Sequence, residues 1–231
     1  MTDSGNTHSN DLPIDRRADT VIVLDFETTG LSPDHGDRAI EIGALRVEQG
    51  RITDRFQRLM NPGRRISSFI EGYTGITNAM LRDAAPCAAV MAEFSEFIED
   101  FDLVAHNAAF DRRFLEAELQ QIRRGCAGAF ACSMLVSRRI YPEAPCHRLG
   151  TLVEYKSIPV SGTFHRALAD AEMTTHLWLQ MLEDITDRHG IRDIPFALMQ
   201  ALGRVPKASA AAFLQQSRNA MESQYLAYCK D

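Results

Sequence analysis

The sequence predicts an α/β protein built on a mixed sheet flanked by helices. Three apolar stretches near residues 20–26, 39–47 and 52–60 are separated by turn-forming residues, as in an antiparallel three-stranded meander. Two shorter apolar stretches, Leu103–Ala105 and Phe130–Cys132, each precede a stretch with helical periodicity. The expected sheet therefore has five strands.

The composition is that of an ordinary globular protein. Of the 231 residues, 45% are hydrophobic and 24% are charged, and the formal net charge is −6. This acidic balance argues against a protein that holds long nucleic acid by bulk electrostatics. It does not exclude a site that grips one strand end through metal ions, because an acidic metal cluster itself lowers the net charge.

The five cysteines are widely spaced and include no CxxC pair, which predicts free thiols in a reducing compartment. No stretch approaches the roughly 18 consecutive apolar residues that a membrane span requires. The first residues also lack the apolar region of a signal peptide. We therefore expect a cytoplasmic location and no membrane partner.

The first half of the chain is predicted in order as follows. Residues 1–19 are polar and lack periodicity, which is typical of a mobile N-terminal tail. Residues 29–38 are dense in turn formers and form a loop after the first strand. Thr77 is placed to cap a short helix over residues 78–82, and Pro86 opens a helix that reaches about Asp100.

The second half alternates helices with the two short strands. Helices are predicted from about His106 to Arg124, from Ser133 to Ile140, over residues 149–155, and from about Arg166 to Asp187. In the last of these, Ala167, Ala171, Leu177 and Leu182 face inward and Trp178 lies beside them. The main domain thus covers residues 20–188. Residues 189–231 form a helical C-terminal extension, either packed on the core or serving as a docking arm.

An acid pair ends the first strand. Residues at alternate positions of a strand point to the same face, so Asp25 and Glu27 converge on one side of the sheet. Two like charges beside an apolar core are costly without a positive charge between them. Mg²⁺ and Mn²⁺ favour such oxygen ligands. The alternative is a strand end whose acids lie in solvent.

Three further residues have chemical interest, and each has an ordinary structural reading. Asp111 lies near a helix start, where acids are common for electrostatic reasons. His165 lies just outside the long helix and Asp170 about one turn inside it. Together with Asp25 and Glu27 they supply four carboxylates and a histidine, the set needed for two-metal phosphoester cleavage with a titratable base.

These residues lie in three segments that resemble the motifs of the DEDDh, or DnaQ-like, 3′–5′ exonuclease family. The proofreading epsilon subunit of bacterial DNA polymerase III belongs to that family. The resemblance covers about residues 20–185. The motifs are Asp25-Phe26-Glu27-Thr28-Thr29-Gly30, His106-Asn107-Ala108-Ala109-Phe110-Asp111 and His165-Arg166-Ala167-Leu168-Ala169-Asp170.

The resemblance implies a ribonuclease H-like fold and two divalent cations, Mg²⁺ or Mn²⁺. Asp25 would bridge both cations, and Glu27 and Asp170 would complete the site of the cation that activates water. Asp111 would serve the second cation. His165 would be the general base.

The resemblance also implies a substrate site. Phe26, Thr28 and Leu31 would line the place of the terminal nucleotide, while His106 and Asn107 would help to hold the strand near the scissile phosphate. Thr74 stands where many relatives carry a histidine, in the run Thr74-Gly75-Ile76-Thr77. This departure leaves the substrate preference open.

The expected activity is removal of nucleoside monophosphates from the 3′ end of single-stranded or frayed nucleic acid, with DNA favoured over RNA. An RNA-trimming exoribonuclease is the alternative within this class. A different class of function is an accessory subunit that docks to a DNA polymerase or another replication partner. A protein of that kind would be free to lose a site residue, whereas Asp25, Glu27, Asp111, His165 and Asp170 are all present.

Overall fold

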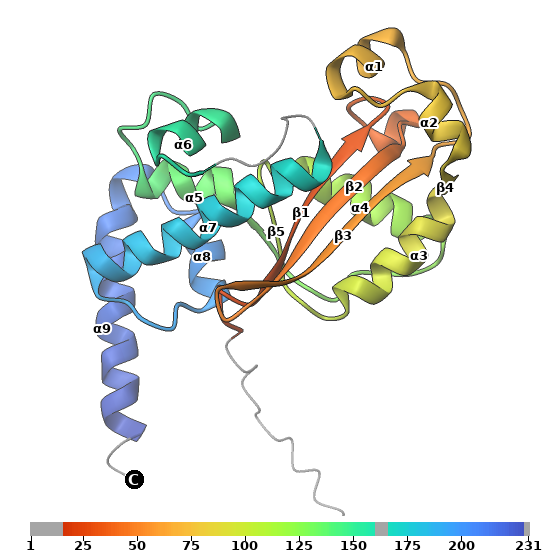
Figure 1. Ribbon diagram of the computed structural model, residues 1–231. Helices are drawn as coiled ribbons and strands as arrows, with labels where there is room; N and C mark the ends of the chain where they lie inside the picture. Colours follow the sequence, from red (N-terminus) through yellow and green to blue (C-terminus); the bar gives the residue numbers. More distant parts are fainter. Residues whose placement is uncertain (1–15, 160–165, 229–231) are drawn as a thin grey trace, which may run out of the picture.

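The computed structural model describes residues 16–159 and 166–228. Over these ranges the chain forms a six-stranded sheet in the order β4-β3-β2-β1-β5-β6, with helices packed on both faces (Figure 1). This confirms the predicted mixed α/β sheet. The strands are β1 (Val21–Thr28), β2 (Ala39–Glu48), β3 (Arg51–Asn61), β4 (Ala85–Pro86), β5 (Leu103–Ala105) and β6 (Phe130–Cys132).

β1 lies in the middle of the sheet, antiparallel to β2 and parallel to β5. β2 and β3 complete the predicted meander through a tight turn at Gln49 and Gly50, which both have positive φ. The strand count differs from the predicted five because β4 pairs with the end of β3. β4 has two residues, one of them a proline, and so carries no periodic signal in the sequence.

The helices bury both faces of the central strands β1 and β2, whereas most residues of β3 are exposed. Among the helices that the structure describes, α1 was not predicted; its seven residues include a glycine, which disfavours a helix interior. The helices are α1 (Ser68–Thr74), α2 (Asn78–Asp83), α3 (Cys87–Ile98), α4 (Ala109–Gln121), α5 (Ser133–Ile140), α6 (Leu149–Tyr155), α7 (Ala167–His189), α8 (Phe196–Leu202) and α9 (Ala210–Tyr228).

Alternate residues of β1 enter two separate cores. Val21 and Val23 pack in a core that includes Trp178 of α7. Ile22 packs in the other core, which includes Phe114 of α4. Because all of these side chains are fully buried, β1 is fixed from both faces and presents the residues that follow with little freedom.

The two ends of the described chain meet at α7. Trp178, predicted to lie beside the buried face, is fully buried, and its indole nitrogen donates to the carbonyl of Ala18 at 2.7 Å. The Ala18 amide in turn donates to the carbonyl of Ile194 at 2.8 Å. Residues 16–19, which the sequence places in the N-terminal tail, are therefore attached to the body of the molecule. The rest of that predicted tail lies outside the described residues.

The C-terminal segment shares the core of α7. Phe196 of α8 is buried with its ring 6.3 Å from that of Trp178, and Leu214 of α9 is buried in the same core. Beyond this contact α9 extends away from the sheet (Figure 1). Within residues 16–159 and 166–228, no helix is long and apolar enough to cross a membrane.

Candidate active site

The two acids at the end of β1 lie on one face of the sheet. Val21 and Val23 enter the core formed with α7, so strand alternation places Asp25 and Glu27 on that same face. The pairing of β1 with β2 shifts register between Glu27 and Thr28, where the strand ends. The predicted convergence of the acid pair is therefore present in the structure.

The start of α7 lies directly on β2 because Gly43 leaves room for it. A Cβ atom at Gly43 would collide with backbone atoms of Ala167 and Leu168. Gly43 also pairs with Asp25 across the β1–β2 ladder. The close contact thus places the first turn of α7, which carries Asp170, beside Asp25.

Three of the four predicted metal ligands come together at this point. Asp25, Glu27 and Asp170 each offer a carboxylate oxygen, and these atoms lie within 4.8 Å of one another. An all-oxygen donor set with this much negative charge suits hard divalent cations. The residues present therefore fit the metal dependence that an exonuclease fold implies.

Asp111 reaches the cluster from the opposite face of the sheet. It lies in the first turn of α4, and its Oδ1 accepts a hydrogen bond from the amide of Phe26 at 3.2 Å. Its side chain is almost completely buried. Because Phe26 lies between the two acids of β1, this bond holds Asp111 next to them and away from solvent.

The protein raises the pKa of three of these carboxyl groups. Burial raises the pKa of Asp25 well above its usual range, and the negative charges of Asp111 and Asp170 raise it further. Burial, with help from the charge of Asp170, raises the pKa of Glu27 to about 8. Burial raises the pKa of Asp111 to about 7. A bound cation would offset this repulsion.

A buried ion pair fixes the start of α7. The Glu41 carboxylate, fully buried on β2, accepts two hydrogen bonds from the Arg166 guanidinium, at 3.1 Å and 2.8 Å. It also accepts from the amide of Ala167 at 3.1 Å and from the side chain of Gln57 at 2.9 Å. Arg166 precedes α7, so this pair holds the helix that supplies Asp170.

A second ion pair fixes α4 to the same strand. Glu118 of α4 accepts two hydrogen bonds from the Arg38 guanidinium, both at 2.8 Å, and a third from the amide of Ala39 at 3.2 Å. Its side chain is almost fully buried. Because α4 also carries Asp111, both helices that bring acids to β1 are attached to the beginning of β2.

Asp25, Glu27 and Asp170 line a cleft of about 770 Å³. Its wall contains unusually exposed apolar side chains: Leu31 is 78% exposed, Phe69 73% and Tyr73 52%. The rings of Phe69 and Tyr73, on α1, are stacked with centroids 6.0 Å apart and an interplanar angle of 10°. Such an apolar platform beside an acidic floor can receive a base while the acids face a phosphate.

Four of the five predicted substrate residues line this cleft: Phe26, Thr28, Leu31 and Asn107. Asn107 has a φ of 72°, a left-handed conformation that asparagine tolerates better than most residues. His106 is not among the lining residues. Its Nδ1 lies 2.9 Å from the hydroxyl of Ser133, and its Nε2 lies 3.0 Å from the carbonyl of His147.

His106 therefore has a supporting position in the structure. Burial lowers its pKa to about 4, so the ring is neutral near pH 7. A neutral imidazole can donate from Nε2 to the carbonyl of His147 and accept at Nδ1 from Ser133. These contacts tie the turn before α4 to α5 and to the loop before α6.

Thr74, which stands in place of the histidine of many relatives, is also in the cleft wall. Its side chain is buried, and its hydroxyl donates to the carbonyl of Ile70 at 2.8 Å and accepts from the amide of Ile76 at 3.1 Å. The hydroxyl thus completes the end of α1.

His165, the predicted general base, lies outside the described residues. Its neighbour Arg166 is described and is held by Glu41. The sequence reasoning missed the roles of Glu41, Gly43, Phe69 and Tyr73. A charged residue inside an otherwise apolar strand was the available signal for Glu41, since such a residue is buried only with a partner.

Most of the chain, including the acid cluster, matches a known protein family. The family model RNase_T, described as Exonuclease, matches residues 22–178. The matched range runs from the apolar part of β1 to the middle of α7. It therefore contains every residue of the acid cluster.

Bacterial polymerases contain similar sequences. PolC-type DNA polymerase III of Bacillus subtilis is 39% identical over 172 residues, which cover 74% of this chain and 12% of that protein. The PolC-type enzyme of Halalkalibacterium halodurans is 40% identical over 168 residues, covering 72% of this chain and 12% of that protein. The chain thus spans about an eighth of the length of these relatives.

Solved structures show the same architecture. Exonuclease X, solved in complex with 5′ overhanging duplex DNA, matches with a TM-score of 0.62 and 26% identity over 79% of this chain and 99% of that chain. The nuclease domain of 3′hExo, a DEDDh family member bound to rAMP, matches with a TM-score of 0.62 over 72% of this chain and 92% of that chain. At 21% identity the second likeness bears on the fold alone.

Proposed function

Because this chain belongs to the RNase_T exonuclease family, we propose that it hydrolyses nucleic acid from the 3′ end and releases nucleoside monophosphates. The family and the DEDDh resemblance are shown by the matches described above, as is the ribonuclease H-like fold. The direction of digestion, the number of cations and the substrate are the content of the proposal.

The observation that carries the proposal is the acid cluster on the floor of the cleft. Carboxylate oxygens of Asp25, Glu27 and Asp170 lie within 4.8 Å of one another. Their ionised forms are disfavoured in this position, since burial and mutual repulsion raise the pKa of Asp25 and Glu27. A pKa shift of this kind at a cleft is typical of a functional site.

Two divalent cations, Mg²⁺ or Mn²⁺, complete the proposed site. Asp25, Glu27 and Asp170 would hold one of them. Asp25 with Asp111 would hold the other. When bound, the cations supply positive charge that stabilises the transition state at the attacked phosphate.

His165 is the proposed general base. It follows from the motif His165-Arg166-Ala167-Leu168-Ala169-Asp170, in which Arg166 is held by Glu41 and Asp170 belongs to the acid cluster. In the proposed step the base takes a proton from water, the water oxygen bonds to phosphorus, and the bond from phosphorus to the O3′ of the preceding nucleotide breaks. The departing O3′ takes up a proton, and a nucleoside 5′-monophosphate leaves.

The apolar wall of the cleft is the proposed place of the terminal nucleotide. The stacked rings of Phe69 and Tyr73, together with Leu31, offer exposed apolar area for a base of any identity. Burial and the charges of Glu27, Asp170 and Asp25 raise the pKa of Tyr73, so its hydroxyl stays protonated and can donate a hydrogen bond. Asn107, which also lines the cleft, supplies a further polar group.

DNA is the favoured substrate because the relatives at 39% and 40% identity are DNA polymerases by name. An exoribonuclease and an accessory subunit of a polymerase are the alternatives. We further propose residues 20–188 as the exonuclease domain and residues 189–231 as an extension. Four free cysteines in the described part of the chain support a reducing, cytoplasmic location.

The test is digestion of one short oligonucleotide, as DNA and as RNA, labelled in separate reactions at its 5′ end and at its 3′-terminal nucleotide. With Mg²⁺ or Mn²⁺, we expect the 3′ label to appear at once as a mononucleotide. The 5′ label should remain on a ladder of shortening products. With EDTA, both labels should stay on full-length material.

Asp25→Ala and Asp170→Ala are the variants that assign the site, and Arg192→Ala is a matched control on the exposed surface. Cleavage by either aspartate variant at the wild-type rate would contradict the site assignment. Failure to release label with any metal would contradict the exonuclease proposal. Release of the 5′ label first would contradict the direction. His165→Ala should lower turnover while cation binding survives.

A further inference from the structure

A second cavity, of about 440 Å³, lies beside the cleft between the loop that follows β3 and helix α2. Arg64, Arg65 and Arg82 line it, and none of its described lining residues is acidic. This is a local excess of positive charge on a chain whose formal net charge is −6. A cavity with three guanidinium groups is suited to phosphate, which arginine binds through paired N–H donors.

Two of the three arginines are available to a ligand. Arg65 and Arg82 are exposed, and within the described part of the chain their side chains form no hydrogen bond or ion pair. Arg64 is engaged: its guanidinium contacts Asp37 at 2.9 Å and the hydroxyl of Thr29 at 3.0 Å. Arg64 thus fixes one wall. Arg65 lies close enough to Glu71 for its charge to act on that carboxylate, but its side chain and that of Arg82 make no hydrogen bond to a described group.

The walls of the cavity are held in place by side-chain hydrogen bonds. The Asn78 side chain, at the start of α2, accepts from the amide of Ile66 at 2.9 Å and donates to the carbonyl of Ile66 at 3.0 Å. The Asn61 side chain accepts from the amide of Gly63 at 2.9 Å. Gly63 has a φ of 73°, which a residue with a side chain adopts less readily. The loop that carries Arg64 and Arg65 is therefore fixed to α2.

The cavity adjoins the cleft that holds the acids. Thr29, which accepts from Arg64, lines the cleft. The residues just after Arg65 lead into α1, whose Phe69 also lines the cleft. β1 and β3 run in the same direction, so both the acid pair and Asn61 lie where these strands end, beside α1 and α2 (Figure 1).

We propose that this cavity, with Arg65 and Arg82, binds backbone phosphates of the nucleic acid beyond the terminal nucleotide. A nucleotide seated against Phe69 leaves the rest of the substrate to continue along the surface. The cavity is a positively charged part of that surface next to the cleft. The phosphates belong either to the digested strand or to the opposite strand of a duplex. This inference rests on the proposed function, because it assumes a nucleic acid in the cleft.

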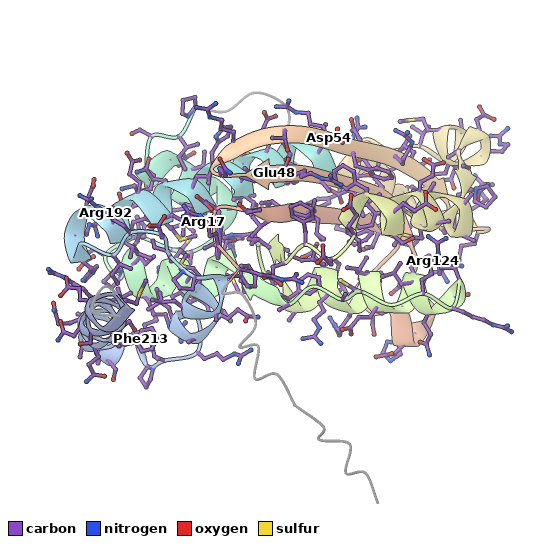
Figure 2. The ribbon with its side chains drawn as sticks, turned by 90° about the horizontal axis from the view of Figure 1, so that it is seen from below. Arg17, Glu48, Asp54, Arg124, Arg192 and Phe213 are labelled. Carbon is purple, nitrogen blue, oxygen red and sulfur yellow. The ribbon has the colours of Figure 1, made fainter. Side chains whose placement is uncertain are left out.

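The test compares R65A/R82A with the control R51A/R192A, which removes the same charge elsewhere. Arg51 begins β3 and Asn61 ends it, so the two ends lie roughly 33 Å apart along the strand. Figure 2 shows Arg192 at the same end of the molecule as Phe213 of α9. Arg51 and Arg192 are exposed and, among the described residues, form no hydrogen bond or ion pair.

Binding of a fluorescent oligonucleotide in EDTA needs no cleavage and measures the cavity directly. For R65A/R82A we expect about tenfold weaker binding. We also expect the slope of log affinity against log salt to fall by about 1.4, from about 0.7 for each phosphate contact on a single strand. R51A/R192A should keep the wild-type slope. An equal slope in both double variants would overturn the proposal.

A small substrate separates this inference from the proposed function. The p-nitrophenyl ester of thymidine 5′-monophosphate has a single phosphodiester and no phosphate that could reach the cavity. The ratio of kcat/KM for the oligonucleotide to kcat/KM for the ester should fall about tenfold in R65A/R82A. If R65A/R82A keeps the ratio of the wild-type protein, the proposed phosphate site in the cavity is wrong. If the wild-type protein cleaves neither substrate with any metal, the proposed function is wrong.

The source of the phosphates follows from two further substrates. A ratio lowered equally on single-stranded DNA and on duplex with a frayed 3′ end assigns the cavity to the digested strand. A ratio lowered on the duplex alone assigns it to the opposite strand. A ratio unchanged on both substrates contradicts the proposal.

Discussion

Two groups of acids lie around the end of β1, and the protein treats them in opposite ways. Glu41 and Glu118 are each held by one arginine through two hydrogen bonds, and each also accepts from a backbone amide. Asp25, Glu27 and Asp111 form no ion pair with arginine or lysine in the described part of the chain.

The difference assigns the two groups of acids to different roles, one in holding the helices in place and the other in the chemistry of the site. The acids with arginines attach α7 and α4 to β2, and their charge is already balanced inside the protein. Among the described residues, the acids without an arginine partner have no ion pair to balance their charge. Burial raises the pKa values of all three, and repulsion between the acids raises those of Asp25 and Glu27 further. Because both groups share one end of one sheet, the comparison predicts opposite responses to substitution.

The largest expected effect is on turnover in Asp25→Asn. The asparagine keeps the shape but removes one charge from the cluster, and we expect kcat to fall on the order of 10³-fold. In EDTA near pH 8 the same variant should be more stable than wild type, because a repelling charge is gone. Turnover on a labelled oligonucleotide measures the fall in kcat, and thermal unfolding in EDTA measures the gain in stability. A less stable variant would break the comparison.

The opposite response is expected when an arginine is removed. Arg166→Met leaves the Glu41 carboxylate fully buried without its arginine partner. This should lower the free energy of unfolding by about 3 kcal/mol. Adding Glu41→Gln should restore most of that loss, since no buried charge then remains. Urea unfolding measures both variants. The corresponding variants at the second ion pair should show the same pattern: a loss of stability in Arg38→Met and its recovery in Arg38→Met/Glu118→Gln. A loss that the second substitution does not restore would contradict this explanation.

A smaller effect is expected from cations, and its size should depend on pH. The folded pKa of Glu27, about 8, lies above its ordinary value of 4.5. The contribution of Glu27 to the stability of the metal-free protein is therefore fully present below about pH 4.5 and is lost as pH rises toward about 8. Mn²⁺ at a hundred times its Kd adds about 2.7 kcal/mol where the acids are ionised.

Thermal unfolding with and without Mn²⁺ measures this dependence. The rise in Tm should be larger near pH 8 than near pH 5, because protons compete with the cation at the lower pH. In Asp25→Asn the rise should be mostly absent at both pH values. An equal rise at both pH values in wild type would contradict the raised pKa values of the cluster.

The smallest predicted effect has the reverse sign and comes from His106. Its folded pKa of about 4 lies below the ordinary 6.5, so the unfolded chain binds the proton more readily. This contribution is fully present above about pH 6.5 and is lost as pH falls toward about 4. His106→Asn should reduce that loss, as followed by urea unfolding in EDTA. If the stability of the variant falls with decreasing pH as steeply as that of wild type, His106 is not the cause of the loss.

Local patterns in the sequence were enough to predict the sheet and the acid pair. β1 could be recognised from four consecutive apolar residues, and alternation alone placed Asp25 and Glu27 on one face. Ala167 of α7, predicted to face inward, is fully buried. The matching space on the sheet comes from Gly43, and no local pattern links two residues so far apart in the sequence.

The parts that could not be predicted depend on long-range contacts. The exposed platform of Phe69 and Tyr73 lies on α1, a short helix that contains a glycine and was not predicted. Glu41 and Arg166 are separated by 125 positions, so their ion pair emerges only when α7 packs on β2. Thr74 could be noted as a departure from the family, but its hydroxyl bonds within α1 are a property of the fold.

The most direct test of the contrast between the two groups of acids is a calorimetric titration with Mn²⁺ near pH 8. Wild-type protein should bind the cation, and so should Glu41→Gln, in which a supporting acid has lost its charge. Asp25→Asn should bind weakly or not at all. Wild-type affinity in Asp25→Asn, or loss of binding in a folded Glu41→Gln protein, would contradict the division of these acids into a cation site and its supports.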